Sequence, residues 1–283
     1  MTRELGQIRG WVFDVDGCLV RTDRAGGHGG EPMPGARELL ISLLDAGHRI
    51  VVCTNASELA PATYAAHLRG MGLPVRDEDF VTAGSAVAEH VFAHDPGARV
   101  LAIGGEGIST PLRAIGLEVV EPGAHGIDAV VVGAASSYSA DDLNAGALAV
   151  DAGAAFYTTV ATPWFSGGKG RSLAVSAAVA ASITFATGRT PLTGGKPSPV
   201  LAEGLLRRLG LSPEVTAVVG DATAETRLAR SMGATAILVL SGATARDELD
   251  RLEEFDRPDV VLDDVAVLQR RLAPHLTTQG AAQ

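Results

Sequence analysis

Residues 10–17 read Gly-Trp-Val-Phe-Asp-Val-Asp-Gly, an apolar run that ends in two aspartates and a glycine. The run is apolar at successive rather than alternate positions, which is typical of a strand covered on both faces of a parallel sheet. Asp14 and Asp16 are two residues apart, so a continuing strand would place both carboxylates on one side. Two carboxylates this close repel each other unless a cation lies between them or one holds a proton. An acidic turn made sharp by Gly17 is the alternative, and a calcium loop is excluded because its downstream acids are missing.

Seven further short apolar runs follow along the chain, and stretches rich in Ala, Leu and Arg separate them. Strands that alternate with helices of this length form βαβ units, so the sequence predicts an α/β fold with a mostly parallel sheet. We expect the strands at 11–15, 49–54, 99–103, 128–133, 155–159, 216–220, 235–240 and 259–262. We expect the helices at 35–46, 60–71, 84–94, 108–115, 140–151, 172–187, 198–209, 224–232 and 243–254.

Polar side chains stand where ligand-binding groups collect in open parallel sheets, at the carboxyl ends of strands. Thr54 and Asn55 end the second run, and their hydroxyl and amide groups suit donation to a phosphate oxygen. Asp221 ends the strand at 216–220, a typical position for a Mg²⁺ ligand. Helix N-caps are the alternative for all three residues.

The lysines are the second signal, because the sequence holds only two of them, Lys169 and Lys196. Lys196 lies in the loop Thr193-Gly194-Gly195-Lys196-Pro197, where its ammonium group suits an anion. A solvated loop lysine is the alternative. A Walker A loop is excluded, because Thr190 and Pro197 occupy positions where that motif needs Gly and Ser or Thr.

Asp14, Thr54, Lys196 and Asp221 occur in the order of the four motifs of the haloacid dehalogenase superfamily, which the chain resembles. Further stretches resemble the branch with a C2-type (class IIA) cap, which includes 4-nitrophenylphosphatase-, phosphoglycolate- and glycerol-phosphate-phosphatase-like enzymes. They include 79–86, 128–133, 186–189, 195–199, 237–242 and 258–259. The resemblance implies a Rossmann-like core of residues 1–83 and 188–283 with an α/β cap inserted at 84–187.

The same resemblance implies a Mg²⁺-dependent phosphatase acting on a small phosphomonoester. Asp14 would attack phosphorus and form an aspartyl-phosphate. Asp16 would protonate the leaving oxygen and then take a proton from the hydrolytic water. Thr54, Asn55 and Lys196 would bind the phosphate. Mg²⁺ would be held by the carboxylates of Asp14 and Asp221 and by the carbonyl of Asp16.

Two departures from the family pattern weaken parts of this assignment. The second acid of motif four is replaced by Thr226, and Glu225 stands one place earlier, where it could orient a metal-bound water or be a surface carboxylate. In the cap, Gly133-Ala134-Ala135 and 158–162 lack the usual polar groups. We expect the glycine-rich loop 163–171 to contribute Trp164, Lys169 and Arg171 to leaving-group binding, or to be a mobile surface loop.

Composition limits the partners and the setting. The net charge of −10 argues against nucleic acid and anionic membranes as partners. Two cysteines form no disulfide framework, and the first residues do not read as a secretory signal, so we expect a cytoplasmic protein. The Ala-rich helix at 172–187 suggests a homodimer through the cap. Residues 25–30 read as a flexible insert, with His28 solvated or touching substrate.

Two other functions stay open at this stage. A phosphotransferase or mutase would use the same aspartyl-phosphate and differ only in the acceptor. A catalytically weak binding or regulatory protein would explain the altered motif four and the altered cap.

Overall fold

The computed structural model describes residues 4–22, 25–167 and 170–276 of the chain. Contacts between Cα atoms divide it into two compact units. The first contains the described residues up to Thr54, Tyr64–Phe80 and the chain from Leu205 onward, and the second contains Asn55–Thr63 and Val81–Gly204. The predicted cap of 84–187 lies inside the second unit, and its predicted boundaries stay a prediction.

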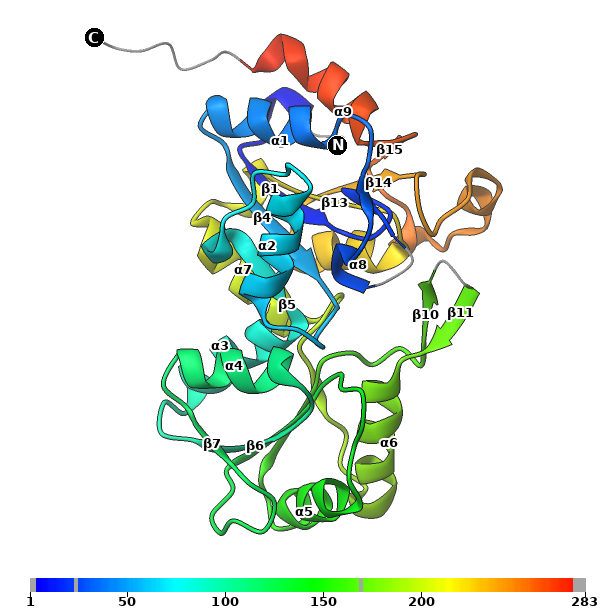
Figure 1. The fold of residues 1–283 in the computed structure, drawn as a ribbon. Coiled ribbons are helices and arrows are strands. Elements are labelled where there is room, and N and C mark those ends of the chain that lie inside the picture. Colours follow the sequence, from blue (N-terminus) through cyan, green and yellow to red (C-terminus); the bar gives the residue numbers. More distant parts are fainter. Residues whose placement is uncertain (1–3, 23–24, 168–169, 277–283) are drawn as a thin grey trace, which may run out of the picture. The chain divides into compact units, whose positions relative to one another are not determined.

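The first unit is built on a six-stranded sheet in the order β15-β14-β13-β1-β4-β5 (Figure 1). Counted along the chain, the sheet order is 6-5-4-1-2-3, the doubly wound arrangement in which the strand order reverses beside the first strand. Its strands are β1 (Gly10–Asp14), β4 (Arg49–Thr54), β5 (Phe80–Thr82), β13 (Thr216–Gly220), β14 (Thr235–Val239) and β15 (Val260–Leu262). Every residue of β1, β13 and β14 is buried, as expected of parallel strands covered on both faces.

Helices cover both faces of this sheet because the crossovers run in opposite directions from β1. A right-handed crossover from β1 to β4 and one from β13 to β14 place their helices on opposite faces. α1 therefore lies beside α9 on one face, while α8 packs on β13 and β14 (Figure 1). The helices are α1 (Ala36–Asp45), α2 (Pro61–Gly70), α7 (Pro199–Leu209), α8 (Thr223–Met232) and α9 (Val265–Leu272), and the division into units cuts α2 and α7.

The second unit is a three-layer α/β sandwich around a parallel sheet in the order β12-β9-β8-β6-β7. Its strands are β6 (Arg99–Ile103), β7 (Glu118–Val120), β8 (Ala129–Val132), β9 (Ala155–Thr158) and β12 (Leu192–Thr193), and its helices are α3 (Ala83–His94), α4 (Glu106–Ala114), α5 (Ala140–Asp151) and α6 (Val175–Thr187). Successive β8 residues face opposite sides: Val131 packs with the α3 and α4 side chains, and Val130 with those of α5 and α6.

The predicted α/β class and parallel sheets are confirmed, and four predicted elements, at 49–54, 99–103, 140–151 and 216–220, match the structure residue for residue. The sequence reading missed the short strands β5, β7 and β12, the helix α9, and two antiparallel hairpins. The hairpins pair β2 (Val20–Arg21) with β3 (Glu31–Pro32) and β10 (Trp164–Gly167) with β11 (Gly170–Leu173).

Two predicted helices are corrected. The helix predicted at 172–187 begins at Val175, because Leu173 pairs with Trp164 in the β10–β11 hairpin. The helix predicted at 243–254 is wrong: two 3₁₀ turns, Arg246–Arg251 and Glu254–Asp256, stand in its place. At the expected start of that helix, the N–H of Ala243 donates to Oδ2 of Asp221 and that of Thr244 to the Asp221 carbonyl.

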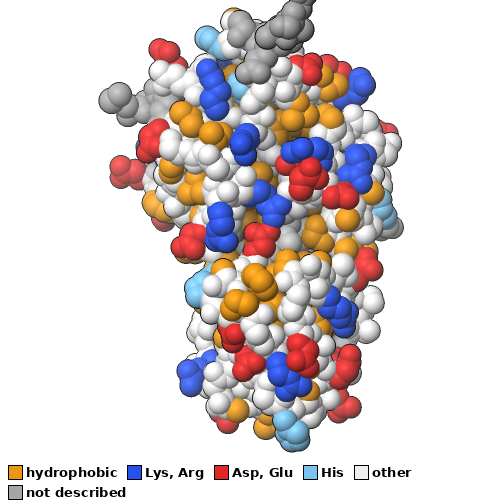
Figure 2. All heavy atoms as spheres, turned by 90° about the vertical axis from the view of Figure 1, so that its left-hand side faces the viewer, with side chains coloured by type: hydrophobic (Ala, Val, Ile, Leu, Met, Phe, Trp, Pro, Cys, Tyr) orange, Lys and Arg blue, Asp and Glu red, His pale blue; other side chains and the backbone are white. Residues whose placement is uncertain are grey.

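Acidic and basic side chains are interspersed over the face shown in Figure 2, where neither sign gathers into one broad patch. Within the described residues, no helix combines the length and the apolar character that crossing a bilayer requires.

Candidate functional site

Three predicted site residues lie at one edge of the first sheet. Asp14 ends β1, Thr54 ends β4, and Asp221 directly follows β13. β4 and β13 are the two neighbours of β1 in the sheet. In the sheet register Asp14 pairs with Cys53, so Thr54 lies one residue further along. All three side chains are buried, with 6% of Asp14, 2% of Thr54 and 8% of Asp221 exposed. The strand order reverses beside β1, where open α/β sheets bind their ligands.

Asp16 does not belong to β1, contrary to the strand geometry assumed from the sequence. The strand ends at Asp14, and the carbonyl of Val15 accepts the N–H groups of Leu19 and Val20 at 3.0 and 2.9 Å, which closes a turn. The Asp16 carboxylate is held by another segment: the N–H of Gly26 donates to Oδ2 and that of Gly27 to Oδ1, both at 2.8 Å. A turn and a distant loop therefore set the position of Asp16.

The carboxylate of Asp221 is enclosed by backbone. The N–H of Ala243 donates to Oδ2 at 2.6 Å. A Cβ atom placed on Gly17 or Gly242 would overlap Asp221 Oδ2, so both glycines are required by close packing. The hydroxyl of Ser241 donates to the carbonyl of Gly17 at 2.7 Å and joins the two loops around the carboxylate. Sequence reasoning missed Ser241 and Gly242 as parts of the site.

The donor atoms at this edge fit a hard divalent cation. Two buried carboxylates, Asp14 and Asp221, end neighbouring strands, and the glycines leave the Asp221 carboxylate a cradle that side chains would fill. Oxygen ligands of this kind suit Mg²⁺. Among the residues whose placement is described, no three His, Cys, Asp or Glu side chains form a metal-binding group. The predicted set of two carboxylates and the Asp16 carbonyl needs no third side chain.

Glu225 is engaged at the start of its own helix. Its Oε2 accepts the N–H of Ala222 at 3.2 Å, which caps the first turn of α8, and only 5% of Glu225 is exposed. A surface carboxylate is therefore ruled out. Thr226, which replaces the usual acid of motif four, is also buried. An orienting role for Glu225 toward a metal-bound water stays a prediction.

Lys196 and Asn55 are bonded to each other in the second unit, although 141 residues separate them in the chain. The N–H of Lys196 donates to Asn55 Oδ1 at 2.7 Å, and Asn55 Nδ2 donates to the carbonyl of Lys196 at 3.2 Å. Lys196 is only 6% exposed, so the alternative of a solvated loop lysine is wrong. Because Asn55 directly follows Thr54, these two bonds fix the Lys196 loop to the residue after the end of β4.

Hydroxyl groups form hydrogen bonds near the ends of strands β8 and β9 of the second sheet. Ser57 is buried; its hydroxyl donates to Thr159 Oγ1 at 3.2 Å and accepts the N–H of Ala134 at 3.1 Å. Tyr138 donates to the carbonyl of Gly133 at 2.7 Å. Burial, the main cause, raises the pKa of Tyr138, so this phenol stays a donor. These groups serve one another and the backbone.

Two of the predicted leaving-group residues, Trp164 and Arg171, lie in the β10–β11 hairpin rather than in a loop. Trp164 belongs to β10 and is 44% exposed. Arg171 belongs to β11, opposite Ser166. Lys169 falls outside the described residues. The structure thus places Trp164 and Arg171 on paired strands.

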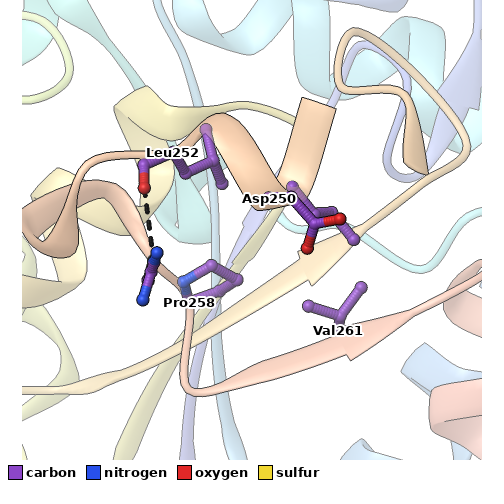
Figure 3. Close-up of a pocket in the computed structure, with 6 residues that line it drawn as sticks. Asp250, Leu252, Pro258 and Val261 are labelled. Atoms are coloured by element: carbon purple, nitrogen blue, oxygen red, sulfur yellow. Dashed lines mark hydrogen bonds between the residues drawn. The ribbon is translucent and has the colours of Figure 1, made fainter. Parts of the chain in front are cut away.

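A shallow cavity of ≈ 330 Å³ lies between the 3₁₀ turn at 246–251 and β15 (Figure 3). Its lining includes Asp250, Pro258 and Val261, and no predicted site residue. The Nε of Arg257 in its wall already donates to the carbonyl of Leu252 at 3.3 Å. The candidate site is therefore the sheet edge with Asp14 and Asp221, and not this cavity.

Comparison with known proteins finds family models that match two parts of the chain. A family model described as haloacid dehalogenase-like hydrolase matches residues 11–118, and one described as HAD-hydrolase-like matches residues 193–268. An acid sugar phosphatase of Staphylococcus aureus is 31% identical over 216 residues, which cover 76% of this chain and 79% of the relative.

Solved structures are similar over nearly the whole fold. A 4-nitrophenylphosphatase from Thermotoga maritima superposes with a TM-score of 0.84 at 28% identity, covering 94% of this chain and 98% of the other. A glycerol phosphate phosphatase from Mycobacterium tuberculosis, in complex with magnesium, gives a TM-score of 0.80 at 28% identity, covering 96% and 78%.

Proposed function

Because the chain belongs to the haloacid dehalogenase-like hydrolases and is an enzyme of their phosphatase branch, we propose that it hydrolyses a small phosphomonoester with Mg²⁺ through an aspartyl-phosphate on Asp14. One observation carries the proposal: the buried carboxylates of Asp14 and Asp221 end neighbouring strands where the order of the sheet reverses. That is where a doubly wound sheet binds a phosphate ester, and a nucleophile and a cation ligand are both required there.

The reaction proceeds in two displacements at phosphorus. An Asp14 oxygen forms a bond to phosphorus while the bond to the ester oxygen breaks, and Asp16 gives its proton to the departing oxygen. Water then attacks the same phosphorus, Asp16 takes the proton of that water, and the bond from Asp14 to phosphorus breaks. Inorganic phosphate leaves and both aspartates return to their starting state. Splitting the transfer in this way replaces one difficult step by two easier ones.

Asp14 and Asp221 would hold Mg²⁺ with their carboxylates, and Asp16 with its main-chain carbonyl. When bound, the ion supplies positive charge that offsets the charge on the carboxylates and the transferring phosphoryl group. The Ala243 N–H and the glycines at 17 and 242 keep the Asp221 carboxylate in one orientation, which is the part the protein itself contributes.

Thr54, Asn55 and Lys196 would bind the phosphate. The Thr54 hydroxyl donates to a non-bridging oxygen, and the Lys196 ammonium offsets its charge and favours the ionised form of Asp14. The mutual bonds between Asn55 and the Lys196 backbone support this role, because they tie the lysine loop to the residue next to Thr54. Burial of Lys196 restricts its side chain, which lowers the entropy lost when it binds an anion.

The relatives support a small phosphate ester as the substrate, since they are a sugar phosphatase, a glycerol phosphate phosphatase and a 4-nitrophenylphosphatase. For this chain the leaving group would meet Trp164, Lys169 and Arg171. Exposure of Trp164 and its neighbour Phe165, at 44% and 46%, supports a hairpin that offers aromatic surface to a ligand.

The test is release of inorganic phosphate from a panel of esters by the wild-type protein and by Asp14→Asn. We expect turnover that requires Mg²⁺, and a loss of about 10³-fold or more in the variant, because the nucleophile is gone. Asp256→Asn is the matched control, since Asp256 is a buried carboxylate of the same unit that is bonded to Arg227. No Mg²⁺-dependent release from any ester would contradict the proposal, and faster transfer to a sugar than to water would make the protein a phosphotransferase.

We also infer a cytoplasmic homodimer that forms through the second unit. Phe185 on α6 is 93% exposed and Leu148 on α5 is 62% exposed, and these two helices pack together. Large apolar side chains exposed to this degree favour association. Cys18 and Cys53 are buried and form no disulfide, which suits a reducing compartment. Light scattering on the wild type and on Phe185→Asp measures the state: a dimer that becomes a monomer is expected, and a monomeric wild type would contradict it.

A further inference from the structure

The segment at 25–28, expected to be a flexible insert, is bonded to the carboxylate of Asp16. Two successive backbone N–H groups, those of Gly26 and Gly27, each donate to a different carboxylate oxygen at 2.8 Å. Both glycines have positive φ, +75° and +76°, and successive N–H groups in such a turn form a small anion-binding concavity. This grip fixes the plane of the carboxylate as well as its position.

A second contact fastens the same segment to α2, within the first unit. Nδ1 of His28 lies 3.2 Å from Nδ1 of His67, and the ring centroids are 4.6 Å apart. Both rings are half-buried, which corrects the expectation that His28 is solvated. One ring donates and the other accepts, so the pair forms when at least one imidazole is neutral.

The helix also meets the segment one turn earlier. Tyr64 lies three residues before His67, hence on the same face of α2. A Cβ atom on Gly26 would overlap the Tyr64 ring, so the segment lies directly against that ring. Outside α2, the Thr22 hydroxyl donates to the carbonyl of His28 at 3.1 Å. α2 therefore contacts Gly26, which donates to Asp16, through Tyr64, and contacts His28 through His67.

We propose that Gly26, Gly27, His28 and His67 are positioning residues that hold Asp16 for proton transfer, with the His28–His67 pair fastening the grip to α2. The inference rests on the proposed function, in which Asp16 exchanges a proton with the leaving oxygen. β1 ends at Asp14, so the central strand of the sheet does not extend to Asp16. A general acid helps only when it reaches the oxygen it protonates, and a displacement of about 1 Å can cost ~10²-fold in rate.

Leaving-group dependence separates this role from a merely structural one. An alkoxide such as that of glycerol needs a proton as it leaves, whereas 4-nitrophenolate does not. We expect His67→Ala to lower kcat/KM about 10-fold on glycerol phosphate and less than ~2-fold on 4-nitrophenyl phosphate, because kcat/KM reports the first displacement, in which only the glycerol leaving group needs Asp16 as an acid. His67→Asn, whose amide group can occupy the place of Nδ1, is expected to restore most of the loss.

The chain offers a matched control in a second histidine pair. The rings of His90 and His94 on α3 lie 4.1 Å apart, and His94 is exposed. His94→Ala removes one ring of that pair and is expected to leave the turnover of both substrates unchanged. In an Asp16→Ala background, His67→Ala should cause no further loss on glycerol phosphate, since the residue it positions is already absent. Equal losses on the two substrates, or full additivity with Asp16→Ala, would overturn the proposal.

A measurement without turnover keeps the inference separate from the proposed function. The amide resonances of Gly26 and Gly27 report the two bonds directly in a ¹H–¹⁵N spectrum. Both are expected to move in Asp16→Ala and in His67→Ala, with faster hydrogen exchange, and to stay in place in His94→Ala. Amides that ignore His67→Ala would refute the fastening even in an active enzyme. Amides that respond in a protein inactive on every ester would leave the grip standing and refute the proposed function instead.

Discussion

The two units share one architecture but differ in the residues that follow their strands. Both are parallel sheets between layers of helices, yet in the first sheet Asp14 and Asp221 follow neighbouring strands, whereas in the second β8 is followed by Gly133 and β9 by Thr159. At those ends Gly133 packs against Ile108, and Ser57 and Thr159 bond to each other. The fold alone therefore does not make a site; charged groups at the strand ends do.

Lys196 tests this comparison, since it is a charged residue that lies three residues after β12 in the second unit. If it binds phosphate, Lys196→Ala should lower kcat/KM by about 10²-fold, the usual loss when one group facing the transition-state charge is removed. Lys196→Arg keeps the charge and should lose less. Arg99→Ala, a cation of the same unit paired with Glu118 on the surface, is the control. Phosphate release measures the activity of all three variants. Wild-type activity in Lys196→Ala would show that Lys196 does not bind the phosphate.

A glycine at a strand end of the second sheet should affect stability rather than chemistry. In Gly133→Ala the new Cβ overlaps the side chain of Ile108, a fully buried residue, so we expect a loss of about 1–3 kcal/mol in the free energy of unfolding. Urea denaturation measures it. Gly97→Ala is the control, since its Cβ would meet only Asp95 Oδ1 at 3.6 Å. A stable Gly133→Ala protein with a slowed chemical step would reverse the comparison.

Substitution of a glycine in the first unit should weaken Mg²⁺ binding instead. In Gly242→Ala the new Cβ overlaps Asp221 Oδ2, so the carboxylate must turn, and we expect about 10-fold weaker Mg²⁺ binding, the size typical of groups that orient a metal ligand. Calorimetric titration with Mg²⁺ measures this without turnover. Gly70→Ala has nothing within 4 Å of its Cβ and serves as the control. Unchanged Mg²⁺ affinity would argue that Asp221 is not a ligand.

Asp256 shows what a carboxylate of the first unit does when its partner is a guanidinium. Nε and Nη2 of Arg227 donate to its two oxygens at 2.5 and 2.7 Å, and this hydrogen bonding lowers the pKa of Asp256 below 3.8. The stabilisation is therefore complete above pH 3.8 and is lost as the pH falls through the lower pKa of the folded state. Arg227→Leu should cost about 1 kcal/mol near neutral pH, because Arg227 is half exposed.

The measurement is urea unfolding of the wild type and Arg227→Leu at neutral pH and well below pH 3.8. The difference between the two proteins should shrink on acidification, while phosphate release at neutral pH is unchanged. A difference that grows in acid would mean that the pair does not stabilise the fold in the way the geometry indicates.

The strand ends were predictable from the sequence because each lies within a few residues of an apolar run. Asp14, Thr54 and Asp221 needed only local pattern and the rule that parallel strands end at one edge. The grip of Gly26 on Asp16 and the bond from Ala243 to Asp221 were not predictable, since both join segments that packing alone brings together.

The pairing of β1 with β13 has a consequence for synthesis of the chain on the ribosome. Gly10 is paired with Thr216, so one side of the central strand lacks its neighbour until most of the protein has been made. At ordinary elongation rates that interval is roughly 10–40 s. For that time the nascent strand presents unpaired N–H and C=O groups to other chains, so this enzyme should depend on chaperones more than its modest size suggests.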